Sequence, residues 1–131
     1  MSQDFTASMP FLRLCGIEIA SATPAEVKGT LAWRDELCTT LGVVHGGALM
    51  TFADSLGALC AFLNLPAGAL TSTIESKTNF FRPFTKGTAH ATATPLHVGR
   101  TTIVVQTDIR DDAGKRVALV TQTQAVITPR P

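Results

Sequence analysis

Hydrophobic and polar positions change their spacing twice along the chain, and these changes divide it into three parts. Near the N-terminus, the segments Gly16–Ala22 and Val27–Trp33 alternate as short β-strands do. From about Gly46 to Leu63, apolar residues cover nearly the whole circumference of a helix. Pro66 and Gly68 then end this helix. An apolar helix of this kind must be enclosed by other elements.

The remainder of the chain has the period of β-strands. In the segment KGTAHATATPLH, Ala89, Ala91 and Ala93 share one face, and a strip of alanines lets a helix approach a sheet closely. The sequence Asp112-Ala113-Gly114 predicts a hairpin turn between two further strands. We therefore predict a single α+β domain over residues 1–131. In it, a curved antiparallel β-sheet of two early and four later strands wraps around one long central helix.

The N-terminal segment and the overall composition bear on export of the protein and on the kind of partner it binds. Residues 5–14 are expected to form a short helix or turn that packs Phe11, Leu12 and Leu14 onto the body. The segment lacks the basic region and long apolar run of a signal peptide. A formal net charge of +1, with scattered Lys and Arg, argues against nucleic acid as the main partner.

The three cysteines and the longest apolar segment indicate the cellular compartment in which the protein is expected. The cysteines are odd in number and form no CxxC pair, which favours reduced thiols in a cytoplasmic protein. No segment reaches about 18 uninterrupted apolar residues, so no membrane span is expected.

Asp54 stands in the middle of the predicted apolar helix. An unpaired buried charge costs several kcal/mol, so this carboxylate needs partners or a water-filled cavity. The segment Gly42–Phe62 contains no Arg or Lys to pair with it. A purely structural carboxylate held by hydrogen bonds is one interpretation. A cavity that admits a polar substrate explains the position better.

The sequence His45-Gly46-Gly47 opens this helix. Two glycines leave the first turn bare, so a ligand atom can approach its N–H groups, which have no partner within the helix. With the helix dipole, they form a site suited to a carbonyl oxygen that gains negative charge. Alone, the motif is weak, because glycine is common at helix starts and His45 can simply cap or pack. An acid nine residues after the histidine makes it much more specific.

This constellation resembles the hotdog-fold acyl-CoA thioesterases, particularly the PaaI-type branch. The segments FLRLCGIEI, VVHGGALMTFADSLGALCAF, STIESKTNFFRPF, ATPLHVGRT and DDAGKRVALVTQTQAVI follow the order and spacing of that family. The resemblance implies hydrolysis of an acyl-CoA or aryl-CoA thioester, with Asp54 as nucleophile or as general base on water. It places the Gly46 N–H on the thioester carbonyl, Gly47 behind it, and His45 beside the leaving sulfur or the water.

Several positions depart from the family pattern. Thr39 stands where many relatives carry Asn or Gln, and Ala58 where several carry Ser or Thr. Thr73 matches a position at which some members place a hydroxyl near the nucleophile. Ser55, next to the acid, is a further hydroxyl at the predicted substrate site, although a helix-surface role suits it better. These departures bear on rate and acyl specificity.

Four residues are candidates for contacts with coenzyme A. Arg82 and Arg100 are basic groups at the expected mouth of the site, and His97 and Gly99 match a turn near the coenzyme in relatives. The alternative for each arginine is an ordinary solvated side chain, and for the turn a plain strand end. Coenzyme A is part of the substrate, so no separate cofactor is expected. The three scattered histidines do not form a metal site.

Spacing within the helix predicts the assembly. Gly46 and Asp54 are eight residues apart, about 12 Å along a helix axis. One thioester carbonyl cannot contact both, so we expect the two groups of one site to come from different subunits. A homodimer is then the catalytic unit, and a homotetramer is the expected assembly. Two other functions belong to related proteins: hotdog hydratases, whose His-Phe-Pro type motif is missing here, and a non-catalytic acyl-CoA-binding module, which remains the alternative.

Overall fold

The structure, a computed structural model, describes residues 5–130 and has the predicted α+β architecture. Two short helices and two strands come first, two 3-10 turns lead into one long helix, and four strands follow. The elements are α1 (Phe5–Ser8), α2 (Pro10–Cys15), β1 (Ile17–Ala22), β2 (Val27–Ala32), η1 (Asp35–Leu37), η2 (Thr40–Gly42), α3 (Gly46–Leu63), β3 (Leu70–Phe80), β4 (Thr88–Val98), β5 (Thr102–Arg110) and β6 (Arg116–Ile127).

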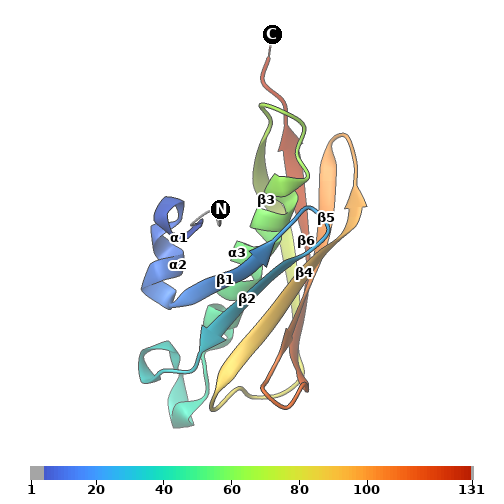
Figure 1. Ribbon diagram of the computed structural model, residues 1–131. Helices are drawn as coiled ribbons and strands as arrows, with labels where there is room; N and C mark the ends of the chain where they lie inside the picture. Colours follow the sequence, from blue (N-terminus) through green and yellow to red (C-terminus); the bar gives the residue numbers. More distant parts are fainter. Residues whose placement is uncertain (1–4, 131) are drawn as a thin grey trace.

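The six strands form one antiparallel sheet in the order β1-β2-β4-β5-β6-β3. This order leaves β1 and β3 at the two edges of the sheet. Helix α3 contacts every strand, and Figure 1 shows strands on either side of it. The prediction of a curved antiparallel sheet around one long helix is therefore confirmed.

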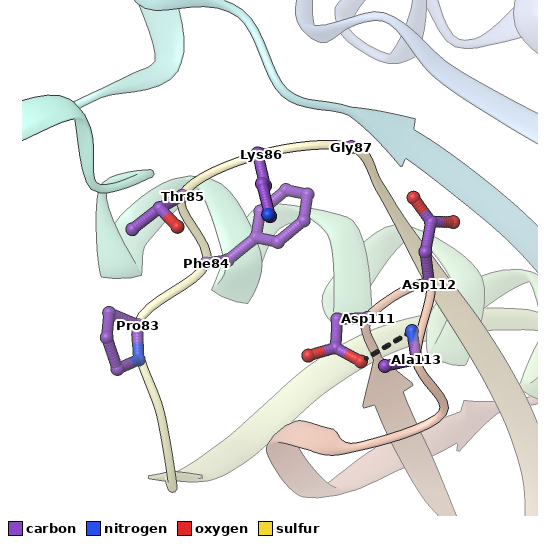
Figure 2. Close-up of a pocket in the computed structure, with 8 residues that line it drawn as sticks. All are labelled: Pro83, Phe84, Thr85, Lys86, Gly87, Asp111, Asp112 and Ala113. Carbon is purple, nitrogen blue, oxygen red and sulfur yellow. Dashed lines mark hydrogen bonds between the residues drawn. The ribbon is translucent and has the colours of Figure 1, made fainter.

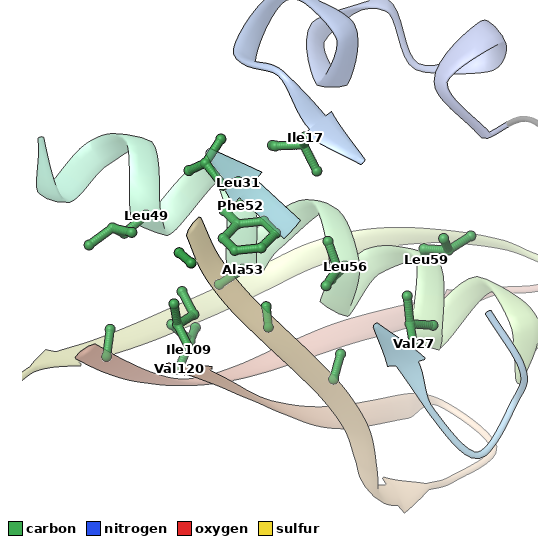
Figure 3. Close-up of a cluster of buried hydrophobic side chains, with 14 of the residues drawn as sticks. Ile17, Val27, Leu31, Leu49, Phe52, Ala53, Leu56, Leu59, Ile109 and Val120 are labelled. Atoms are coloured by element: carbon green, nitrogen blue, oxygen red, sulfur yellow. The ribbon is translucent and has the colours of Figure 1, made fainter. Parts of the chain in front are cut away.

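Helix α3 is the centre of the hydrophobic core. Its buried side chains meet inward residues of the strands (Figure 3). The alanine strip of β4 lies among them, because Ala89, Ala91 and Ala93 are at most 2% exposed. By length and apolar composition alone, α3 also qualifies as a candidate membrane span. Here its buried side chains, among them Leu49, Phe52 and Leu56, pack against the sheet, where each contributes roughly 1.5–3 kcal/mol.

One face of α3 is not enclosed, so the prediction of an all-round covered helix is wrong there. Met50 and Phe62 are 40% and 52% exposed, and Asp54 between them is half-buried. Met50, Asp54, Ala58 and Phe62 follow one another at four-residue intervals, so they form one line along the helix. The sheet of a single chain curves around only part of the helix and leaves this line open.

The N-terminal helices pack less tightly than predicted. Leu12 is buried, but Phe11 and Leu14 are 56% and 69% exposed. Side chains on a helix are about 100° apart per residue, so a six-residue helix that buries Leu12 turns its neighbours outward. The prediction that all three pack onto the body holds for Leu12 alone.

Candidate active site

The N-terminus of α3 has one backbone donor left over. His45 is the N-cap, and its Nδ1 accepts a hydrogen bond from the Gly47 N–H at 2.8 Å. The carbonyl oxygen of His45 accepts from the N–H groups of Ala48 and Leu49. Within residues 5–130, no acceptor lies within hydrogen-bonding distance of the Gly46 N–H. His45 is therefore a capping residue here, and Gly46 carries the free donor at the positive end of the helix dipole.

Gly46 lies against an aromatic ring. A Cβ atom at this position would stand 3.1 Å from Cζ of Phe80, which is itself 51% exposed. Gly46 also lines a hollow of about 220 Å³ together with Thr39, Phe80 and Arg82. The structure thus brings three predicted site residues, Thr39, Gly46 and Arg82, to one place. Sequence reasoning missed Phe80, and its one signal was the apolar pair at the end of TNFF.

Asp54 projects from the middle of α3 toward β6 and β3. Its Oδ1 accepts one hydrogen bond from Gln122 Nε2 at 3.2 Å and one from the Thr73 hydroxyl at 3.3 Å. It forms no ion pair with any residue of the described range. Asp54 also lines a hollow of about 390 Å³. The carboxylate therefore has both the partners and the cavity that its position required, and Thr73 lies beside it as predicted.

Two buried glutamines behind Asp54 were not found from the sequence. Gln122 and Gln124 are each 1% exposed, on the same face of β6 as Val120. Gln124 Nε2 donates to the Thr73 hydroxyl at 2.7 Å. The signal was the sequence TQTQ in an alternating strand, where polar residues occupy positions that the pattern assigns to the core.

Ser55 and Gly47 share the hollow of Asp54 but have no free donor to offer. The Ser55 hydroxyl donates to the Thr51 carbonyl oxygen at 2.7 Å, and the Gly47 N–H is bound to His45. Both residues line this hollow together with Phe11 and Met50. They shape its wall, and their hydrogen-bonding groups are used within the helix.

Gly46 and Asp54 line two separate hollows of one chain. This separation agrees with their spacing of eight residues, about 12 Å along the helix axis. Within one chain, the free N–H and the carboxylate do not face a common cavity. A site that uses both needs a second chain.

The turn between β4 and β5 holds the other predicted coenzyme residues. The Gly99 N–H donates to the Thr102 carbonyl oxygen at 2.8 Å, and a Cβ at Gly99 would stand 2.5 Å from His97 Nε2. Arg100 is exposed at the same turn. In Figure 1 this turn lies at the opposite end of the sheet from the start of α3. One chain therefore does not bring His97, Gly99 and Arg100 together with Arg82 and Gly46.

A further hollow, of about 310 Å³, lies beside the β5–β6 turn (Figure 2). Its two carboxylates bind the chain's own groups. Asp111 Oδ1 accepts from the N–H groups of Ala113 and Lys115. Asp112 contacts His90 Nε2 at 2.8 Å and accepts from the Thr88 N–H at 3.0 Å, and these two bonds hold its pKa below the usual range. Asp111 therefore closes the turn on itself, and Asp112 fastens the turn to β4.

The cysteines and other polar clusters offer no competing centre in the described part of the chain. Burial raises the pKa of the Cys60 thiol to about 11, so it stays protonated near neutral pH. Partial desolvation, followed by the charges of Asp35 and Glu36, raises the pKa of Cys38. No group of three or more His, Cys, Asp or Glu residues within 5–130 is arranged to hold a metal ion.

Comparison with known proteins places the fold in a family. The sequence profile of the Thioesterase superfamily matches residues 41–118, which include α3 and strands β3, β4 and β5. A candidate esterase of Vibrio cholerae is 35% identical over 91 residues, 70% of this chain and 61% of that protein. A candidate esterase of Haemophilus influenzae is 31% identical over 112 residues, 86% of this chain and 81% of that protein.

Solved structures agree with the sequence comparison. Thioesterase HI1161 from Haemophilus influenzae superposes with a TM-score of 0.86 at 30% identity, covering 90% of this chain and 82% of that one. A mutant of thioesterase PA1618 from Pseudomonas aeruginosa superposes with a TM-score of 0.89 at 26% identity, covering 97% and 96%. The chain therefore belongs to the thioesterase superfamily, a family of hotdog-fold thioester hydrolases.

Proposed function

We propose that this protein hydrolyses acyl-CoA thioesters, aryl- and hydroxyaryl-CoA among them, with Asp54 as the catalytic acid residue. One observation carries the proposal: among residues 5–130, the Asp54 carboxylate accepts hydrogen bonds through Oδ1 alone, and it borders an open hollow beside a largely apolar helix. A carboxylate kept half-buried beside a cavity, with no ion pair in the described residues, suits attack on a bound substrate.

The chemistry has two routes that use the same groups. Asp54 attacks the thioester carbonyl carbon, the C–S bond breaks to release the CoA thiolate, and water then hydrolyses the acyl anhydride. Alternatively, Asp54 takes a proton from water as this water attacks the same carbon directly. The C–S bond then breaks, and the released CoA thiolate takes the proton from Asp54. In both routes negative charge develops on the carbonyl oxygen, where the Gly46 N–H donates. His45 offers its Nε2 to the leaving sulfur, because Nδ1 is bound to Gly47.

The proposed catalytic unit is a homodimer formed through β3. This strand is eleven residues long and lies at the sheet edge, where no strand of residues 5–130 pairs with its outer N–H and C=O groups. Leu70, Ile74 and Phe80 on it are 66%, 63% and 51% exposed. An edge this long, with three exposed apolar side chains among its polar ones, is a template for a second strand. We propose that two such dimers form a tetramer.

Antiparallel pairing of two β3 strands assembles a complete site. One part of β3 contacts Asp54 through Thr73, and its end contacts Gly46 through Phe80. When two β3 strands pair antiparallel about their midpoints, the Thr73 part of one strand faces the Phe80 end of the other. The partner's Gly46 is then brought beside Asp54, so each dimer holds two sites.

Arg82 is proposed to contact a phosphate of coenzyme A, since it lines the hollow of Gly46. Its Nε donates to the Arg116 carbonyl oxygen at 3.0 Å, which leaves the other guanidinium donors for a ligand. His97, Gly99 and Arg100 lie at the other end of the sheet. Their contribution to the same coenzyme must come from another subunit.

The test is free-thiol release from a panel of short-chain, long-chain, aryl and hydroxyaryl CoA thioesters. We expect the wild type to hydrolyse at least one class, and Asp54→Asn to turn over at least about a hundredfold more slowly. Asp35→Asn, which neutralises an exposed carboxylate outside the site, is the matched control and should retain the wild-type rate. A wild type that binds CoA thioesters without releasing thiol would instead be a non-catalytic binding module.

A further inference from the structure

We infer that Gln122 is a positioning residue, which holds one oxygen of Asp54 so that the other is presented to the substrate. This inference rests on the proposed function, because it assigns Asp54 the reacting carboxylate. Both donors to Asp54 in the described range go to Oδ1, from Gln122 Nε2 and the Thr73 hydroxyl. Oδ2 has no protein donor within residues 5–130, and it is the oxygen left to react.

The burial of Gln122 shows that stability alone does not explain it. Its side chain is 1% exposed and occupies a core position on β6. Its Oε1 is buried and has no hydrogen-bond partner in the described residues. An unsatisfied buried acceptor costs about 1–3 kcal/mol, so an apolar side chain of similar length would stabilise the fold more. The amide is retained where it reaches Asp54.

Gly57 gives independent support, because its lack of a side chain leaves room for the Gln122 amide beside α3. A Cβ atom at Gly57 would overlap Oε1 of Gln122. Glycine in a helix interior costs about 1 kcal/mol relative to alanine. Gly57 follows Asp54 by three residues, so both lie on the same side of the helix. The glycine therefore lowers the stability of the helix at the position where the Gln122 side chain reaches the Asp54 carboxylate.

The orientation of the amide follows from the same contacts. With the amide reversed, Oε1 would face the carboxylate oxygen of Asp54, and two acceptors would oppose each other. With the amide as it stands, Nε2 donates to the charged group, which is the stronger type of hydrogen bond. The Asp54 carboxylate thus fixes the orientation of the Gln122 amide, and the amide fixes the orientation of the carboxylate.

A second arm supports the same oxygen from β3. Gln124 Nε2 donates to the Thr73 hydroxyl, so that hydroxyl directs its own hydrogen toward Asp54. The charged residues on the adjoining strands, Glu75 and Lys77 on β3 and Arg116 on β6, form no hydrogen bond or ion pair with Asp54. Two neutral donors therefore set the orientation of the carboxylate.

The test compares Gln122→Met, Gln122→Glu and Thr107→Val with the wild type. Gln122→Met keeps length and removes the donor, so kcat should fall about 10- to 100-fold with KM changed less than about twofold. Thr107→Val removes another buried polar group that has no partner in the described residues, and kcat should not change. A folded Gln122→Met with the kcat of Thr107→Val would overturn the inference.

Gln122→Glu is isosteric and supplies a readout that a packing role would not move. It places a second carboxyl group about 3 Å from Asp54, and two carboxylates at that distance cannot both ionise freely. The acidic limb of the kcat/KM profile should shift to higher pH, and an unshifted limb would contradict the inference. This variant also serves if Gln122→Met does not fold.

A wild type inactive on every thioester would refute the proposed function without deciding this inference. In that case crystal structures of the wild type and of Gln122→Met are compared. Loss of the donor should leave the Asp54 carboxylate in more than one orientation, because one of the two groups that hold Oδ1 is gone. A carboxylate that keeps the single wild-type orientation in Gln122→Met would overturn the positioning role.

Discussion

The middle and the N-terminus of α3 carry the two halves of the proposed site, and the chain completes only one of them. In the middle, Asp54 Oδ1 receives donors from β6 and β3 of its own chain. At the N-terminus, the Gly46 N–H has no acceptor in the described residues, and Phe80 beside it is half exposed. The carboxylate is held by side chains of its own chain, whereas the Gly46 N–H has no partner among the described residues.

The difference follows from where the sheet covers the helix. Strand β6 passes behind the middle of α3 and buries Gln122 and Gln124 there. Strand β3 lies at the edge, so its contacts to Gly46 come from one ring that faces open space. The edge strand touches both halves, and a partner strand paired with it would change the surroundings of both.

A charge on the β3 edge should have the largest effect, because it should change both the assembly and the turnover rate. Ile74→Lys places a cation at the proposed dimer interface, where it cannot be solvated without separating the strands. We expect monomers by light scattering and a loss of turnover of at least about a hundredfold, because each site lacks its donor. Ile127→Lys, on an exposed isoleucine of β6, is the control. A monomeric Ile74→Lys with full activity would refute the shared site.

A methyl group at Gly57 should damage the Asp54 half and leave the Gly46 half intact. Gly57→Ala overlaps the Gln122 amide, and overpacking of this kind costs about 1–3 kcal/mol. Unfolding in urea should show that loss, and kcat should fall about tenfold as Gln122 is displaced. The double variant Gly57→Ala/Gln122→Ala removes the overlap, so stability should return while kcat stays low. Recovery of both would show that Gln122 acts through packing alone.

Asp112 provides the smallest effect, because it is a held carboxylate outside the site. Its folded-state pKa is lowered, chiefly by the hydrogen bond with His90 and then by the Thr88 N–H. The stability it contributes is therefore present above the unfolded pKa, about 3.9, and is lost as pH falls through the folded value. Asp112→Asn should lower the Tm slightly at pH 7, with the difference closing in acid, and should leave kcat unchanged. A changed kcat would show that this turn is part of the active site.

The fold was accessible from the sequence because its signals are local. The alanines of β4 and the apolar stretch Gly46–Leu63 have regular periods, and the structure reproduces both. The face around Met50 was misjudged, since composition alone does not show which side of a helix a sheet will cover.

The candidate site was accessible only in part. Asp54 and Gly46 follow from motif and spacing, and Thr73 from the family resemblance. The structure places Thr73 beside Asp54 and Gly46 beside a hollow. Gln122 and Phe80 come from strands 68 and 34 residues away in the chain from the groups they contact. Such long-range contacts depend on strand register and sheet order, which a single sequence does not specify.

We propose that the acid and the donor of one site belong to different chains. Gly46→Pro removes the donor at a helix position that tolerates proline, and its loss should cost roughly 3 kcal/mol in the transition state. Asp54→Asn removes the acid, so each homodimer should be nearly inactive. Mixed dimers of the two variants, confirmed by mass, should recover about half the wild-type activity, because one site then carries both defects and the other neither. Mixed dimers that stay inactive would contradict the account.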